Sequence, residues 1–130
     1  MPPPGIAAAA LGFSATMASV VMRSAATEAA LKMAGAEHFK GKLVVDTTNP
    51  LEFSNGKPPT MFVGTTDSLG ERIQRALPGA HVVKAFNTVG NAHMFRPDFK
   101  GGPQDMFICG ENENAKKKMS AILKDFGWGV

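Results

Sequence analysis

The sequence predicts an α/β fold with a mainly parallel sheet, and two features carry this prediction. Short apolar runs rich in β-branched residues alternate with stretches of helical periodicity, as expected when helices connect parallel strands. The run at 43–45 is continuously apolar and β-branched, which is typical of a parallel strand buried on both faces. A length of 130 residues suits one compact domain.

The first half of the chain predicts a strand end, a helix and a long loop around the buried strand just described. Residues 20–22 predict the strand end. The alanine-rich residues 25–34 predict a helix that stops at Gly35, a residue type favoured after helix ends. Turn-forming residues mark 47–66 as a long loop, and residues 61–63 predict a short strand within it.

The next segment predicts a helix, a strand and a long irregular stretch. Ser68 and Glu71 have the spacing of a capping box, which predicts a helix that continues to Ala76. A turn then leads into the predicted strand at 81–86. Residues 87–94 predict a loop with a short helix, and residues 95–105, with their Gly and Pro, predict an irregular connection.

The last segment predicts a strand, a capped helix and the start of another strand. Residues 106–109 are apolar and predict a strand, and Asn112 is a good cap for the helix that follows. Apolar residues recur there at helical spacing, at Met119, Ile122, Leu123 and Phe126. Gly127 ends the predicted helix, and residues 128–130 predict the start of a strand.

Charge and cysteine content limit the expected partners. The formal net charge of +3 is small, and no basic patch with interleaved aromatic residues predicts nucleic-acid binding. The basic run 116–118 falls in the last predicted helix, where a solvated face explains it. The single cysteine, Cys109, is expected to be a small buried hydrophobic residue, and one thiol fits a reducing compartment, so we expect a cytoplasmic protein.

The first 22 residues carry no charged side chain, yet they predict neither a membrane span nor a signal peptide. A spanning helix needs about 20 predominantly apolar residues, whereas this stretch is mostly Ala, Pro, Gly, Ser and Thr. A secretory signal opens with basic residues, which are missing here. We therefore expect residues 1–19 to be a poorly ordered or unrelated leader and residues 20–130 to form the domain.

Two predicted loops carry candidate site residues, because ligands of parallel sheets bind beyond the carboxyl ends of the strands. Thr48 and Asn49 offer a hydroxyl and an amide that can bond a ribose or a carboxamide. Asn87 and Thr88 offer the same groups after the next long strand, and Gly90 would let a ring approach the backbone. These residue types are also common as turn formers and helix caps, so composition leaves both interpretations open.

Other chemistries lack their residue patterns. His38, His81 and His93 have no metal-ligand spacing, so we expect no metal site, and we place the last two at surface turns. Asp46 ends a strand where a carboxylate could act in catalysis, but no partner acid stands at a useful spacing. The sequence contains no G-x-S-x-G elbow, no Walker motif and no G-x-G-x-x-G phosphate loop.

Residues 40–130 resemble the NADP-dependent reductases of a deazaflavin coenzyme. The resemblance rests on four ordered segments, GKLVVDTTNPLEF (41–53), VGTTDSLGERIQRALPGAHVVKAFNTVGNAHM (63–94), GGPQDMFICG (101–110) and KDFGWGV (124–130). It implies a partial doubly wound, Rossmann-like α/β domain with a mainly parallel sheet. The family's first strands and its phosphate-binding part have no counterpart in residues 1–19.

The resemblance implies an oxidoreductase that uses NADP(H) and a deazaflavin or flavin-like hydride acceptor as small-molecule partners. Hydride transfer mainly requires that two rings be positioned, which explains why no acid–base pair stands out. The implied cofactor-binding residues are Arg23, Ser24, Thr48, Asn49, Pro50 and Leu51. The implied catalytic residues, where the acceptor would stack on the nicotinamide, are Asn87 and Thr88.

The alternative hypothesis is a non-catalytic, truncated Rossmann-like fragment that acts as an interaction module. The missing phosphate loop motivates it, because pyrophosphate contacts supply much of the affinity for NADP. An incomplete sheet would expose an edge strand, so homo-oligomerisation through that edge is expected in this case.

Overall fold

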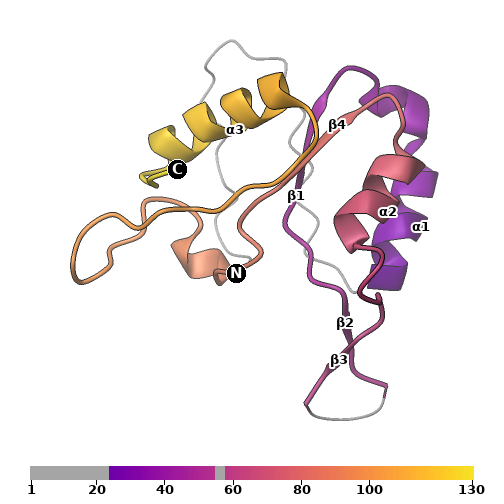
Figure 1. Ribbon diagram of the computed structural model, residues 1–130, viewed down its shortest axis with the longest axis horizontal. Helices are drawn as coiled ribbons and strands as arrows, with labels where there is room; N and C mark the ends of the chain where they lie inside the picture. The colour runs from indigo at the N-terminus through magenta and orange to yellow at the C-terminus, as the bar shows by residue number, and fades with distance from the viewer. Residues whose placement is uncertain (1–23, 55–57) are drawn as a thin grey trace, which may run out of the picture.

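A parallel pair of strands forms the centre of the computed structural model, which describes residues 24–54 and 58–130. Strands β1 (Leu43–Asp46) and β4 (His81–Lys84) pair in register, from Leu43 opposite His81 to Asp46 opposite Lys84. Helices flank this pair on both sides (Figure 1). The parallel pairing with flanking helices confirms the predicted α/β, Rossmann-like architecture.

The two faces of the strand pair pack against different helices. Side chains alternate between the faces of a strand. Val44 and Val82 belong to a hydrophobic cluster with residues of α1 (Ser24–Ala34) and α2 (Leu69–Ala76). Val45 and Val83 belong to a second cluster with residues of α3 (Glu113–Asp125). Figure 1 shows α3 on one side of the strands and α1 with α2 on the other.

Local signals place the helix ends as predicted. Gly35 follows α1 with a φ of 79°, a value that L side chains rarely adopt. The Ser68 side chain accepts a hydrogen bond from the Glu71 backbone N–H at the start of α2. At the start of α3, Asn112 Oδ1 accepts from the Ala115 N–H at 2.8 Å. The three helix predictions are confirmed to within a residue or two.

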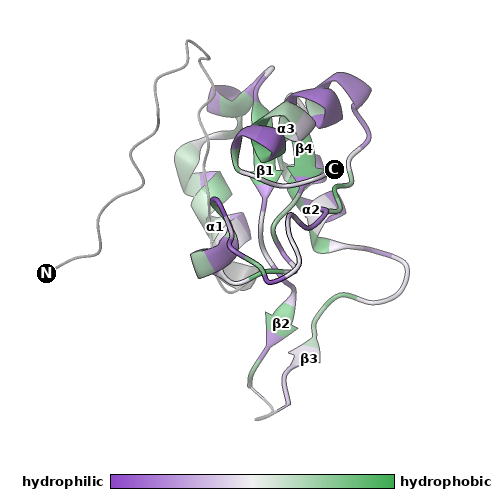
Figure 2. Cartoon of the chain, turned by 90° about the vertical axis from the view of Figure 1, so that its left-hand side faces the viewer, coloured by the Kyte–Doolittle hydropathy of each residue, from purple (hydrophilic) through white to green (hydrophobic). Residues whose placement is uncertain are grey.

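A small antiparallel hairpin interrupts the long loop after β1. Strand β2 (Leu51–Glu52), which the sequence did not predict, pairs with β3 (Thr60–Met61). The strand predicted at 61–63 therefore starts one residue earlier and is shorter than expected. Figure 2 shows the hairpin projecting away from the rest of the domain. Its side chains Leu51, Phe53 and Met61 are exposed.

The predictions of strands at 106–109 and 128–130 were wrong. The first segment crosses the end of β4 instead of running along it, so Cys109 and Lys84 form one isolated antiparallel bridge. The second meets Asp105 through a single parallel bridge at Gly129. Strand β4 also ends earlier than predicted, at Lys84. Met106 and Trp128 are buried in the cluster beside α3, so these two apolar side chains contribute to packing, whereas Phe107 and Val130 are exposed.

Three single-residue expectations can be compared with the structure. Cys109 is exposed, so its predicted burial was wrong, since the segment around it crosses the strand edge rather than entering the sheet. His81 lies within β4 and is half-buried, not at a surface turn. His93 is exposed in the short helix η2 (Asn91–His93), which agrees with the predicted short helix. A further short helix, η1 (Ala36–Phe39), follows α1.

Two predictions fall outside the described residues. The strand end at 20–22 and the leader at 1–19 lie there entirely, so both stay predictions. Within residues 24–54 and 58–130, no helix is long and apolar enough to cross a membrane. The same residues contain no group of three potential metal-ligating side chains.

Candidate functional site

The two predicted loops meet at the carboxyl edge of the parallel strands. Asn49, after β1, donates a hydrogen bond from Nδ2 to the backbone oxygen of Asn87, after β4, at 2.8 Å. A longer contact of 3.4 Å runs from Asn87 Nδ2 to Asn49 Oδ1. The loops meet because parallel neighbouring strands end at the same edge. Residues 38 positions apart thus form one polar surface.

A buried carboxylate lies directly behind this surface. The Asp46 side chain is fully buried, and its Oδ1 accepts hydrogen bonds from the Thr48 backbone N–H at 2.9 Å and from the Thr48 hydroxyl at 2.6 Å. Its Oδ2 accepts from Lys84 Nζ at 2.7 Å. A buried charge is costly unless it is paired and hydrogen-bonded, and here both carboxylate oxygens have partners.

Sequence reasoning missed Lys84, although a signal for it existed. The parallel strands end as LVVD and HVVK, and pairing them in register places Asp46 opposite Lys84. Lys84 Nζ also donates to the Thr48 backbone oxygen at 2.7 Å. The basic partner of Asp46 is 38 residues away in the sequence, and only the register of the sheet brings the two together.

The predicted site residues differ in exposure. Asn49 and Thr88 are exposed and Asn87 is half-buried, so these three can reach a ligand. Thr48 is buried, and its hydroxyl donates a hydrogen bond to Asp46. Pro50 is buried as well.

The other three predicted residues lie on the hairpin or at the boundary of the described residues. Leu51 lies on the hairpin strand β2, where it pairs with Met61. Ser24 begins α1, but its side chain lies outside the described part of the chain. Arg23 lies outside the described residues altogether. The contacts bring together Thr48, Asn49 and Asn87, and the ligand roles of all these residues stay predictions.

The backbone turns sharply just before Asn87. Phe86 has a φ of 62°, although it is not glycine, and its side chain is buried in the cluster beside α3. Such conformations are uncommon for bulky residues and are retained when the surrounding packing enforces them. Ala85 still bonds to β1, because its N–H donates to the backbone oxygen of Asp46 at 3.0 Å. The strand therefore ends at a buried aromatic anchor, and the polar residues follow at once.

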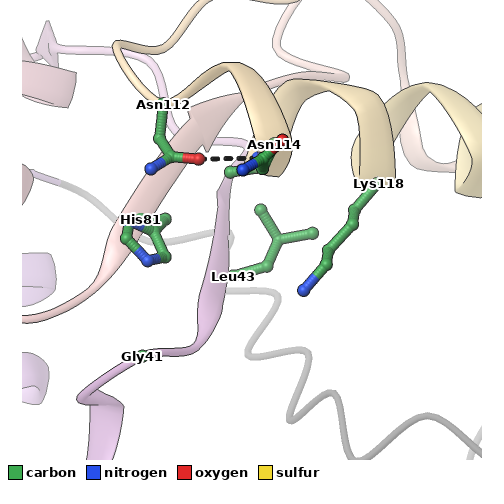
Figure 3. A pocket seen from close by; sticks show the side chains of 7 residues that line it. Gly41, Leu43, His81, Asn112, Asn114 and Lys118 are labelled. Atoms are coloured by element: carbon green, nitrogen blue, oxygen red, sulfur yellow. Dashed lines mark hydrogen bonds between the residues drawn. The ribbon is translucent and has the colours of Figure 1, made fainter.

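A separate cavity lies at the opposite, amino edge of the strands (Figure 3). It has a volume of about 210 Å³ and is lined by Gly41, Leu43 and His81 together with residues of the first turns of α3. In Figure 3, Asn114 and Lys118 of α3 lie beside Leu43. None of the predicted site residues lines this cavity.

The fold and the polar edge define a Rossmann-like α/β domain. No family model matches the chain. The chain is similar, however, to a solved structure from Arthrobacter sp. FB24, a candidate F420-dependent NADP reductase, with 45% identity, a TM-score of 0.77 and coverage of 82% of this chain. A second similar structure is the hypothetical protein SMa0349 from Sinorhizobium meliloti, with 26% identity, a TM-score of 0.67 and the same coverage of this chain.

This chain resembles the deazaflavin-dependent NADP reductases, as its motifs predicted. F420 is a deazaflavin coenzyme, so the name of the Arthrobacter structure agrees with the resemblance. The chain spans about half the length of the two solved structures, 49% and 50% respectively. The similarity therefore supports an NADP oxidoreductase-like fold over the part that is shared.

Proposed function

We propose that this chain holds the nicotinamide end of NADP(H) at the carboxyl edge of β1 and β4. We further propose that it supports hydride transfer to a deazaflavin or flavin-like acceptor. The observation that carries the proposal is the 2.8 Å hydrogen bond between Asn49 and Asn87, which joins two predicted ligand loops into one surface. The similarity to a candidate F420-dependent NADP reductase supports the choice of both cofactors.

The side chains at this edge fit a nicotinamide. A carboxamide presents one oxygen acceptor and one NH₂ donor, and an exposed asparagine can satisfy both. Asn49 uses one N–H on the Asn87 backbone, which leaves its second N–H for a ligand. Thr88 adds an exposed hydroxyl that can donate or accept. The pyrophosphate is a different matter, because the sequence has no G-x-G-x-x-G loop to hold it.

The residues of this chain bind and orient in the proposed reaction. When bound, the nicotinamide supplies a hydride and a deazaflavin or flavin ring accepts it. Asn49 would fix the orientation of the carboxamide, and Asn87 and Thr88 would contact the acceptor side. Rate enhancement of this type comes from holding two rings in reactive geometry, so no side chain needs to carry a proton.

The test is a titration of the full chain with NADPH, followed by mixing with a deazaflavin or with FMN. We expect binding at micromolar NADPH and loss of the nicotinamide absorbance only when an acceptor is present. Asn49→Ala should weaken NADPH binding. The matched control is Asn114→Ala, an exposed asparagine at the opposite edge of the sheet, which should bind as the unchanged protein does. Absence of NADPH binding would overturn the proposal.

One observation favours a second candidate function, self-association with another copy of this chain. The projecting hairpin exposes three apolar side chains, Leu51, Phe53 and Met61, and Met61 is 63% exposed. An isolated two-stranded hairpin is at best marginally stable in water, so a covering surface would stabilise it. Sedimentation at several concentrations tests this. We expect a dimer that Met61→Lys dissociates, and a monomer at all concentrations would contradict it.

A further inference from the structure

Lys84 links the two strand ends and the loop between them. Its ammonium group donates to Asp46 Oδ2 and to the Thr48 backbone oxygen, both at 2.7 Å. We call these two hydrogen bonds the Lys84 clamp. The Lys84 side chain is only 20% exposed and that of Asp46 is fully buried, so solvent screens the clamp only weakly.

The clamp lies on the side of the sheet that faces α2. Asp46 and Lys84 stand two residues after Val44 and Val82 in their strands, and side chains two apart share a face. A methyl group built on Gly70, in the first turn of α2, would lie 3.6 Å from Asp46 Oδ2. The carboxylate therefore lies between the sheet and the amino end of a helix, where negative charge is favourable.

The clamp determines where the next residue can go. Thr48 is held on three atoms, because its N–H and hydroxyl bond to Asp46 and its carbonyl oxygen bonds to Lys84. Asn49 follows directly, and its amide reaches Asn87 on the far loop. With Thr48 fixed to β4 on one side and Asn49 bonded to the loop after β4 on the other, the amide of Asn49 has little freedom.

We propose that Lys84 is a positioning residue, which orients the Asn49 amide for the nicotinamide through the Asp46–Thr48 turn. The inference rests on the proposed function only for the identity of the ligand. Lys84 contacts neither the nicotinamide nor the acceptor ring. It acts by holding a backbone carbonyl in place.

The test compares the double variant Asp46→Asn, Lys84→Met with the unchanged full chain. Asparagine keeps an oxygen that can accept from Thr48, whereas methionine removes the clamp and leaves no unpaired buried charge. The single variant Lys84→Arg keeps a positive charge and hydrogen-bond donors at this position. Lys118→Met, at an exposed lysine of α3, is the control. Three quantities are measured, the urea midpoint, the NMR signals and exchange rate of the Asn49 side-chain NH₂, and the NADPH dissociation constant.

We expect the double variant to fold, its Asn49 NH₂ to shift towards solvent values with faster exchange, and its NADPH dissociation constant to rise on the order of tenfold. Lys84→Arg should recover part of both effects, and Lys118→Met should match the unchanged chain. An unchanged Asn49 signal in the folded double variant overturns the inference. So does failure of that variant to fold, because Lys84 would then support the fold itself. If the unchanged chain binds no NADPH, the proposed function fails, and the Asn49 signal still decides the role of Lys84.

Discussion

Gly110 lies close against the backbone of β4, and we predict that Gly110→Ala destabilises the domain. A Cβ atom built at this position lies 2.7 Å from the Val82 carbonyl oxygen, well inside the 3.4 Å at which ordinary contacts begin, and 3.3 Å from a Val83 methyl group, just inside it. The clash is with backbone, which cannot rotate away. The chain can respond in two ways, and both lower the free energy of unfolding.

If the segment stays in place, it bears the strain of an overpacked site, about 1–3 kcal/mol. If it moves away from β4, it loses the two hydrogen bonds between Lys84 and Cys109, which have lengths of 2.8 and 3.2 Å and contribute about 1 kcal/mol each. Either response lowers the free energy of unfolding by roughly 1–3 kcal/mol.

Urea unfolding followed by fluorescence measures this loss, because the single tryptophan, Trp128, is buried in the cluster beside α3. The matched control is Gly64→Ala. A Cβ atom there meets nothing within 4 Å, so this variant should keep the unfolding free energy of the unchanged chain. A Gly110→Ala variant whose unfolding free energy lies within about 0.5 kcal/mol of the unchanged chain would contradict this prediction.

Three further predictions concern the helices. Ser68→Ala removes the cap of α2 and should cost about 1 kcal/mol in urea unfolding, whereas Ser68→Asp should not, and equal stability of the two variants contradicts this. Leu123→Ala, at a fully buried position of α3, should cost about 2–5 kcal/mol, and a smaller loss than for Leu123→Met would be inconsistent with the packing. Hydrogen bonds from Arg75 and then Arg72 hold the pKa of Asp67 below its ordinary value of 3.8. Because the pKa of Asp67 is lower in the folded state than in the unfolded state, the ionised carboxylate stabilises the fold above a pH of about 4. This stabilisation is lost as the pH falls through the folded-state pKa. Asp67→Asn should therefore weaken the decrease of stability at acid pH in a stability–pH curve.

The carboxyl edge was predictable from the sequence, whereas its inner organisation was not. Small polar residues after two apolar runs located Asn49 and Asn87, and the structure joins them by a hydrogen bond. The role of Thr48 was not predictable in the same way, because the sequence does not show whether a loop threonine donates its hydroxyl hydrogen bond to a ligand or to a buried carboxylate. Only the register of two strands, which is set by packing on both faces, shows that Lys84 holds Asp46 and Thr48.

The three helices with their ends and the two strands of the parallel pair were predictable from the sequence alone. These depend on local physics, namely periodicity, caps such as Ser68 and Asn112, and a glycine at positive φ after α1. The tertiary structure decided which apolar segments became strands. Residues 106–109 are apolar, yet they meet β4 at one isolated bridge only, because a strand requires a ladder of hydrogen bonds with a neighbouring backbone rather than a single bridge.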